Sequence, residues 1–440
     1  MSYAGASPAH AEHDPRRVVA LPTSTAQQRI LLIAFHFPPL AGSSGIQRTL
    51  GFVRHLPAFG WEPIVLSAHP RAYERTSDDL LHALPNDLIV KRAPAWDTSR
   101  HLSIRGRYPG TFARPDRWLS WWPGAVWAGM QLIRRLQPSV IWSTYPIATA
   151  HLIGASLARL SGLPWIADFR DPMAQDNYPT DGAVWRRFKA IEERAATRAA
   201  AWVFTTPGAL RYYRQRYPEI QTRMHVIENG YDESMFDALR PGGEPLIPGR
   251  YTLLHSGIVY PSERDPTALF AALHRYKAGG GPPLTLRFRA AVHDTLLQEL
   301  AGRYGVEDCV DIQPAIPYRA ALAEMLRADA LLIMQASNCN DQIPAKLYEY
   351  LRAGRPVAGL TDPAGDTART LHAAGIEAIA PLDDSDAIAS LLHSLTGRRA
   401  GLRTQATASA IAGASRRGRT EEFARLLARV AACPPCGPMP

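Results

Sequence analysis

The stretch "RILLIAFHFPPLAGSSGIQRTLGFVRHLPAFGWEPIVL", residues 29–66, indicates how this chain folds. It opens with a short apolar run that stops at a Pro-Pro pair, a pattern typical of a buried parallel strand. A turn rich in Gly and Ser follows, then a helical pattern closed by Gly60, and then a second apolar run. Strand, glycine-rich turn, helix and strand make one βαβ unit, so we expect an α/β protein.

The same alternation of strand and helix patterns continues along most of the chain. It predicts a doubly wound, Rossmann-like domain over residues 29–236 and a second one over residues 250–396. The Pro- and Gly-rich residues 237–249 are predicted to form the linker. Residues 1–28 are expected to be a flexible tail, and residues 397–440 a helix that packs back on a domain and a loose end. Because ligands of such sheets bind beyond the carboxyl ends of the strands, we expect a site in the interdomain cleft.

Length and composition agree with a two-domain globular protein. The chain has 440 residues, too many for one compact core, of which 46% are apolar and 20% charged. It contains no apolar run long enough to span a membrane, and its N-terminus lacks the apolar core of a secretory signal. The net charge of +9 is compatible with an anionic membrane or a phosphorylated ligand, but the scattered basic residues form no recognised nucleic-acid module.

The four cysteines do not suggest a disulfide scaffold. Cys433 and Cys436 form a single CPPC pair at the C-terminus. Without a partner pair or a following helix, such a pair is a weak signal for a metal or redox site. We therefore expect a protein of the reducing cytoplasm.

The glycine-rich turn holds Gly42, Ser43, Ser44 and Gly45 between the first strand and its helix. Glycines let the backbone approach a ligand, and a helix N-terminus offers free N–H groups and a partial positive charge. The turn is neither a dinucleotide-binding fingerprint nor a P-loop. A phosphate site and a plain strand-to-helix turn therefore both remain open.

A charged segment, "ADFRDP" at residues 167–172, follows another apolar strand. A carboxylate there, Asp168 or Asp171, can act as a base or orient a sugar hydroxyl. In the alternative interpretation, Asp171 caps the next turn and pairs with Arg170.

The segment "HSGIVYPSERDP", residues 255–266, ends the first strand of the second domain at Gly257. Arg264 can bind a diphosphate through bidentate hydrogen bonds. A charged loop in which Asp265 caps the next helix is the alternative, and the two interpretations are compatible.

The segment "NDQIPAKLYEYLRAGRPVAGL", residues 340–360, breaks a local rule. Lys346 lies in the first turn of a helix that begins near Pro344, where the partial positive charge of the helix disfavours a cation. A lysine at this unfavourable position suggests that an anionic ligand compensates its charge. Glu349 lies on the same helix face and can bind a ribose hydroxyl, and Asp341 in the preceding loop can bind a second hydroxylated ring. A half-buried helix with a solvated Lys-Glu pair is the alternative.

Together these segments resemble the GT-B glycosyltransferases of the retaining family 4, over roughly residues 29–395. The most specific part is Asp341-x7-Glu349 within "KLYEYLRAGRPV", which is similar to the acidic-x7-Glu motif of that family. The segment "HVIENGYD" looks like the family's sequence before the interdomain linker. It places Asn229, Gly230 and Asp232 near the domain junction.

The resemblance implies that the C-terminal domain binds a nucleoside-diphosphate sugar. Glu349 is then expected on the ribose and Asp341 at the donor sugar, with Arg264 and Lys346 on the diphosphate. Residues 42–45 are expected to close over the diphosphate from the other domain. The resemblance implies neither a metal nor a bound cofactor, because cationic side chains can stabilise the departing nucleoside diphosphate.

The sequence departs from the family pattern in three places. Asp341 stands where Glu is commoner, and no lysine closely follows Arg264. Asp168 and Asp171 stand where many members have a His. These departures leave Asp341, Asp168 and Asp171 as the catalytic candidates.

The resemblance implies a retaining, hexosyl-transferring enzyme that acts on a glycan or lipid-linked acceptor in cell-surface polysaccharide or glycolipid synthesis. Two rival hypotheses share the fold. One is a nucleotide-sugar epimerase, which needs no acceptor, and the other is a non-catalytic protein that binds a partner or a polysaccharide.

The segment "RPDRWLSWWPGAVWAGMQLIRRLQP", residues 114–138, is rich in tryptophan and ends in Arg134 and Arg135. This pattern is typical of a helix that lies at a lipid surface. Alternatively, the tryptophans fill the domain core. A basic face of this kind predicts peripheral contact with the anionic inner face of the cell membrane.

Overall fold

The computed structural model describes residues 28–43, 45–103, 108, 110–176, 178–237, 239, 242–397 and 401–432. The expected N-terminal tail lies outside these residues except for Gln28, which begins the first strand. Ser44 and the CPPC pair, Cys433 and Cys436, also lie outside them.

Two parallel sheets organise the chain, as predicted. The first has the order β3-β2-β1-β4-β5-β6-β7 and the second the order β10-β9-β8-β11-β12-β13. The strands of the first are β1 (Gln28–Ile33), β2 (Trp61–Ala68), β3 (Ile89–Ala93), β4 (Val140–Thr144), β5 (Trp165–Arg170), β6 (Ala201–Phe204) and β7 (Met224–Val226). Those of the second are β8 (Tyr251–Ser256), β9 (Leu284–Arg289), β10 (Val310–Gln313), β11 (Ala330–Gln335), β12 (Val357–Thr361) and β13 (Ile379–Ala380).

Helices connect successive strands, as doubly wound folds require. Those of the N-terminal domain are α1 (Gly45–His55), α2 (Thr98–His101), α3 (Trp121–Leu136), α4 (Ala148–Ser161), α5 (Gly182–Arg198) and α6 (Pro207–Arg216). Those that follow are α7 (Thr267–Ala278), α8 (Asp294–Tyr304), α9 (Tyr318–Arg327), α10 (Lys346–Ala353), α11 (Asp366–Ala373), α12 (Ser385–Thr396), α13 (Ala408–Gly413) and α14 (Arg416–Ala432). Short 3-10 helices are η1 (Leu56–Phe59), η2 (Pro70–Ala72), η3 (Asp78–Ala83), η4 (Gly110–Ala113), η5 (Pro218–Arg223), η6 (Glu233–Met235), η7 (Glu307–Cys309) and η8 (Ser337–Cys339).

The first βαβ unit shows why the chain folds this way. Residues 30–33 of β1 are completely buried and pair in parallel with residues 63–66 of β2. The intervening helix ends at His55, earlier than predicted, because Pro57 has no N–H with which to continue it, and the 3-10 helix η1 (Leu56–Phe59) follows. Gly60 then reverses the chain in the left-handed conformation, with φ of 80°.

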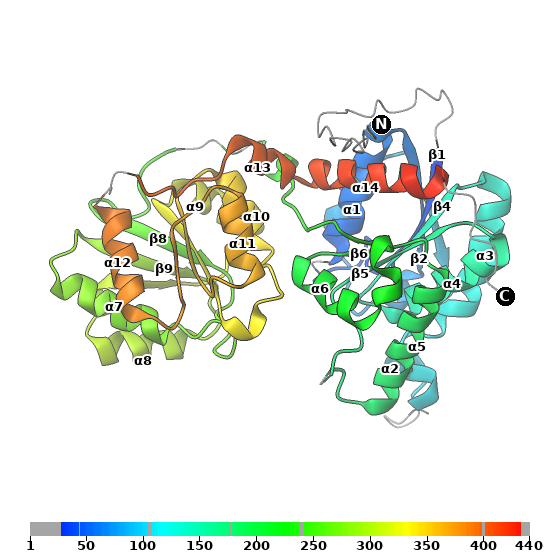
Figure 1. Cartoon of the computed structure of the whole chain (residues 1–440), viewed down its shortest axis with the longest axis horizontal. Helices are drawn as coiled ribbons and strands as arrows, with labels where there is room; N and C mark the ends of the chain where they lie inside the picture. Colours follow the sequence, from blue (N-terminus) through cyan, green and yellow to red (C-terminus); the bar gives the residue numbers. More distant parts are fainter. Residues whose placement is uncertain are drawn as a thin grey trace, which may run out of the picture.

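The C-terminal helix returns to the N-terminal domain. Phe423 of α14 packs on Phe52 of α1 with ring centroids 4.5 Å apart. Figure 1 shows the two sheets in separate lobes, with α14 lying along the N-terminal lobe beside α1. None of the described helices is long and apolar enough to cross a membrane.

Candidate active site

The two domains enclose a cavity of about 1020 Å³ at the carboxyl ends of their strands. Its lining includes Gly42, Ser43 and Arg170 from the N-terminal domain, Tyr318, Ala345 and Glu349 from the C-terminal domain, and Arg416 and Arg419 from α14. A ligand in this cavity contacts both domains at once.

Lys346 begins α10 and points to the end of β8. Its Nζ lies 3.1 Å from Nε2 of His255, whose Nδ1 lies 3.0 Å from the carbonyl oxygen of Leu332. Because a carbonyl only accepts, the His255 proton sits on Nδ1 and the bare Nε2 accepts from Lys346. Burial, followed by the charge of Arg264, lowers the pKa of Lys346 to about 7. The charge of Glu349 opposes this shift but does not cancel it, so the protonated amine is less stable here than in water.

Arg264 is a second cation close to Lys346. Its Nη1 lies 3.4 Å from the carbonyl oxygen of Ile258, and its buried Nε has no hydrogen-bond partner among the described residues. Gly257 lies beside the pair with φ of 119°, and a Cβ there would come within 3.0 Å of the Lys346 Nζ. Lys346 and Arg264 are two cations with unused hydrogen-bond donors, and they lie beside Gly257, which has no side chain. This arrangement fits a diphosphate.

Glu349 lies one helical turn after Lys346 and lines the cavity. Its Oε1 accepts a 2.5 Å hydrogen bond from the hydroxyl of Tyr318 at the start of α9. Burial is the main cause that raises the pKa of Glu349. The position and the acceptor oxygens suit a sugar hydroxyl, which donates its proton to a carboxylate.

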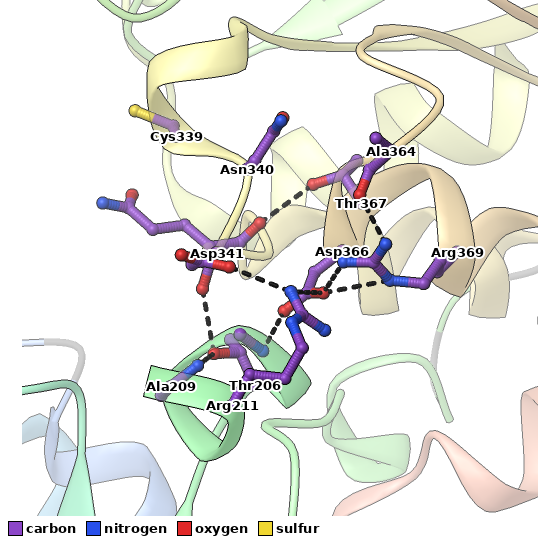
Figure 2. Close-up of polar contacts among 12 residues, drawn as sticks. Thr206, Ala209, Arg211, Cys339, Asn340, Asp341, Ala364, Asp366, Thr367 and Arg369 are labelled. Carbon is purple, nitrogen blue, oxygen red and sulfur yellow. Dashed lines mark hydrogen bonds and ion pairs between the residues drawn. The ribbon is translucent and has the colours of Figure 1, made fainter. Parts of the chain in front are cut away.

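The Asp341 side chain contacts α6 of the N-terminal domain. Figure 2 shows its carboxylate against Arg211, with an Oδ1–Nη2 distance of 2.9 Å. Its main-chain oxygen accepts a 2.9 Å bond from the Thr206 hydroxyl. Asp341 is not among the residues that line the cavity. The two motif acids therefore occupy different parts of the interdomain region.

Asp168 is completely buried at the end of β5 and does not line the cavity. It accepts two bonds from Arg48, from Nε at 2.7 Å and from Nη2 at 3.3 Å. Arg48 also donates to the main-chain oxygen of Glu228. This geometry gives Asp168 the role of neutralising Arg48 inside the N-terminal domain.

Arg170 and Asp171 complete the charged segment. Arg170 has a left-handed backbone, with φ of 61°, at a register shift between β5 and β6. Its Nε is buried without a partner among the described residues, and Arg170 lines the cavity. Asp171 is exposed when the whole residue is considered. Its carboxyl group is nevertheless desolvated by the surrounding protein, which raises its pKa. Its Oδ1 lies 3.5 Å from the Thr205 hydroxyl.

The glycine-rich turn packs against Arg170. Ser43 Oγ lies 2.9 Å from His36 Nδ1 and accepts a bond from the Gly45 N–H. A Cβ on Gly45 would lie 2.6 Å from His36 Nδ1 and 2.8 Å from the Arg170 guanidinium, so a side chain there would have to displace both groups. Gly42 has φ of 78°, which favours glycine. The turn thus brings backbone and a cation to the N-terminal wall of the cavity.

The predicted junction residues lie where the chain passes between the domains. Asp232 bonds to Arg54 of α1 and to Arg416 of α14, each at 2.9 Å. A Cβ on Gly230 would lie 2.6 Å from the Ala414 carbonyl oxygen. Asn229 lines the cavity beside them.

Several residues of this region were not predicted from the sequence. Arg211 and Asp366 join the domains, Tyr318 holds Glu349, and His255 accepts from Lys346. Each acts on a residue far away in the chain, and periodicity and spacing report only local structure. Among the described residues, no cluster of three or more His, Cys, Asp or Glu side chains is placed to hold a metal ion.

Comparison with known proteins gives a fold for the chain and a family match for part of it. Residues 44–230 match the family described as a glycosyl transferase 4-like domain. No curated protein matches the sequence.

Three solved structures share the architecture. HepE of Anabaena, in complex with UDP, has a TM-score of 0.62 at 13% identity and covers 91% of this chain and 100% of its own. The lipopolysaccharide outer core galactosyltransferase WaaB has a TM-score of 0.62 at 12% identity and covers 91% and 99%. Sucrose-phosphate synthase of Thermosynechococcus elongatus has a TM-score of 0.58 at 15% identity and covers 92% and 99%. At these identities the likeness establishes the fold.

Proposed function

This chain carries a glycosyl transferase 4-like domain in a GT-B fold, and we propose that it transfers a sugar, with retention of configuration, from a nucleoside-diphosphate sugar. The observation that carries the proposal is the pair of incompletely bonded cations, Lys346 and Arg264, beside Gly257 at the start of α10. A diphosphate there gains the charge-assisted hydrogen bonds that the protein leaves unmade.

The proposed donor orientation follows from the positions of the acids and cations. With the diphosphate at Lys346 and Arg264, we place the ribose at Glu349, which lies one helical turn after Lys346. Glu349 lines the interdomain cavity, whereas Lys346 and Arg264 are not among its lining residues. The leaving diphosphate gains negative charge as the glycosidic bond breaks, and the two cations stabilise that charge in the transition state. Ser43 and Gly42 approach from the other domain, where α1 directs its N-terminus to the cavity.

We propose UDP-sugars as the first donors to test, because the similar HepE structures hold UDP and UDP-glucose. Nucleoside diphosphates are screened for thermal stabilisation, since a ligand that binds only the folded state raises its melting temperature. UDP-sugars are then incubated with candidate glycan and lipid-linked acceptors. A new glycoside and free nucleotide support the proposal, whereas an isomerised sugar nucleotide indicates an epimerase.

We also propose that the acceptor domain touches an anionic membrane from the cytoplasmic side. On α3, Trp121 is completely buried, but Trp127 is 65% exposed and Trp122 is 37% exposed. Arg134 and Arg135 are exposed at the end of the same helix. Exposed aromatic and basic side chains on one helix favour a lipid interface.

Flotation with vesicles that contain anionic lipid tests this surface. The wild-type chain is expected to float with the vesicles, and Trp127→Ala combined with Arg134→Gln is expected to reduce the floated fraction. Equal flotation with neutral and anionic vesicles contradicts the electrostatic part of the proposal.

A further inference from the structure

The two domains meet directly at the first turn of α6. Figure 2 shows this contact, in which Thr206 and Arg211 of the N-terminal domain face Asp341 and Asp366 of the C-terminal domain. The main-chain N–H of Gly208 also bonds to Asp366. The Asp341 loop leads directly into α10, and the residues of this contact are different from those proposed above to hold the nucleotide.

Asp366, at the start of α11, is completely buried in this contact. Its Oδ2 accepts the main-chain N–H of Gly208 at 2.5 Å, and its Oδ1 accepts Arg211 Nη2 at 3.0 Å. Within its own domain, Arg369 Nε donates to Oδ1 at 3.2 Å. A buried carboxylate is stable only with such donors, and the other domain supplies two of them.

Only one oxygen of the Asp341 carboxylate, Oδ1, has a partner among the described residues. Arg211 binds Oδ1, and the Thr206 hydroxyl fixes the main-chain oxygen of the same residue. No described residue donates to Oδ2, and the Asp341 side chain is 65% exposed. One oxygen is therefore fixed and the other is free to accept from a ligand.

Gly208 sets how closely the domains approach. A Cβ at this position would lie 2.6 Å from the Asp341 Cα and closer still to its side chain. Backbone cannot yield as a flexible side chain can, so any residue larger than glycine separates the two surfaces.

We propose that Arg211 is a positioning residue for sugar transfer: by clamping Asp341 and Asp366 to α6, it fixes the loop that leads from Asp341 into α10, the helix that carries Lys346 and Glu349 of the proposed donor site. This inference rests on the proposed function, in which Lys346 and Glu349 of α10 hold the donor. Arg211 itself touches no reacting atom. Its effect comes from holding a group to the geometry that the transition state requires, where small displacements cost much of the rate.

Arg211→Gln tests the role directly. It is expected to lower kcat about 10- to 100-fold. The KM for the donor is expected to change less than about threefold, because Glu349, Lys346 and Arg264 are untouched. Arg211→Lys should restore part of kcat, since it keeps the charge. Arg214→Gln, an exposed arginine of the same helix, is the matched control and should leave both constants unchanged.

Gly208→Ala tests the contact by a different route. Alanine favours a helix, so the N-terminal domain keeps its fold, but the added Cβ separates the domains. We expect a loss of kcat like that of Arg211→Gln and a larger radius of gyration in X-ray scattering. Gly182→Ala is the control, because at the start of α5 a Cβ would meet only the Arg186 guanidinium, at 3.7 Å.

The outcomes separate this inference from the proposed function. An active wild type with unchanged kcat in Arg211→Gln and Gly208→Ala overturns the inference alone. A raised kcat also overturns it, because it means that the contact holds the Asp341 loop in an unproductive position. A wild type that forms no glycoside contradicts the proposed function and the role of Arg211 with it, while scattering of Gly208→Ala still shows whether the contact sets the domain spacing.

Discussion

The two domains differ in whether the buried charges of the site are paired with an opposite charge. In the N-terminal domain, the buried Asp168 is matched by two hydrogen bonds from Arg48. In the C-terminal domain, burial and then the charge of Arg264 depress the pKa of Lys346, and neither cation is paired with a carboxylate of the described residues. We infer that the paired charges stabilise the fold, whereas the cations without a carboxylate partner indicate the binding site of an anionic ligand.

The largest effect is expected from Lys346→Met. It removes a cation that we place on the diphosphate, so kcat/KM for the nucleotide sugar should fall about 100- to 1000-fold. Steady-state kinetics measure the loss. Lys277→Met, which removes an exposed lysine paired with Asp308 on the surface, should leave kcat/KM unchanged.

Asp168→Asn should act on stability instead. It leaves the Arg48 charge buried without its counter-ion, which costs about 3 kcal/mol of the free energy of unfolding. All ten tryptophans lie between residues 61 and 202, so tryptophan fluorescence during urea unfolding follows the N-terminal domain. If stability is unchanged and turnover is lost, Asp168 has a chemical role and the comparison fails.

Gly257→Ala is expected to weaken nucleotide binding about tenfold. The new methyl group crowds the Lys346 amine, and a positive φ of 119° strains any alanine by about 1–3 kcal/mol. Gly305→Ala separates the two causes, because that position also has positive φ but nothing within 4 Å of a Cβ. Only the Gly257 variant should change the calorimetric affinity.

The smallest effect is the pH dependence of nucleotide binding. The Lys346 pKa of about 7 rises when a diphosphate binds, so binding takes up a proton above that pH. Affinity should therefore be full below pH 7 and fall by at most about tenfold per pH unit above it. Calorimetry in buffers of different ionisation enthalpy measures the uptake, and Lys346→Met should abolish it.

The sequence predicted the two sheets and the family resemblance because both rest on local patterns. Alternating strands and helices repeat along the chain, and "KLYEYLRAGRPV" keeps its motif spacing within one loop and helix. The comparisons confirmed the GT-B fold, and residues 44–230 match the glycosyl transferase 4-like domain. The roles of Glu349, Lys346 and Arg264 remain predictions, although the structure brings the last two together.

The remainder of the site depends on contacts that no local pattern contains. The sequence could not show that Asp168 pairs with Arg48, because Asp168 lies in β5 and its partner lies 120 residues earlier, in α1. It also could not show that Arg211 meets Asp366, since that bond forms only when the two domains come together. Spacing identified the charged segments, but only packing decided which charges are neutralised.

Calorimetric titration of three proteins with one nucleoside diphosphate tests the central claim most directly. The account predicts equal affinity for the wild type and for folded Asp168→Asn, and a loss of about 100-fold or more for Lys346→Met. Equal affinity in all three, or a loss confined to Asp168→Asn, would contradict it.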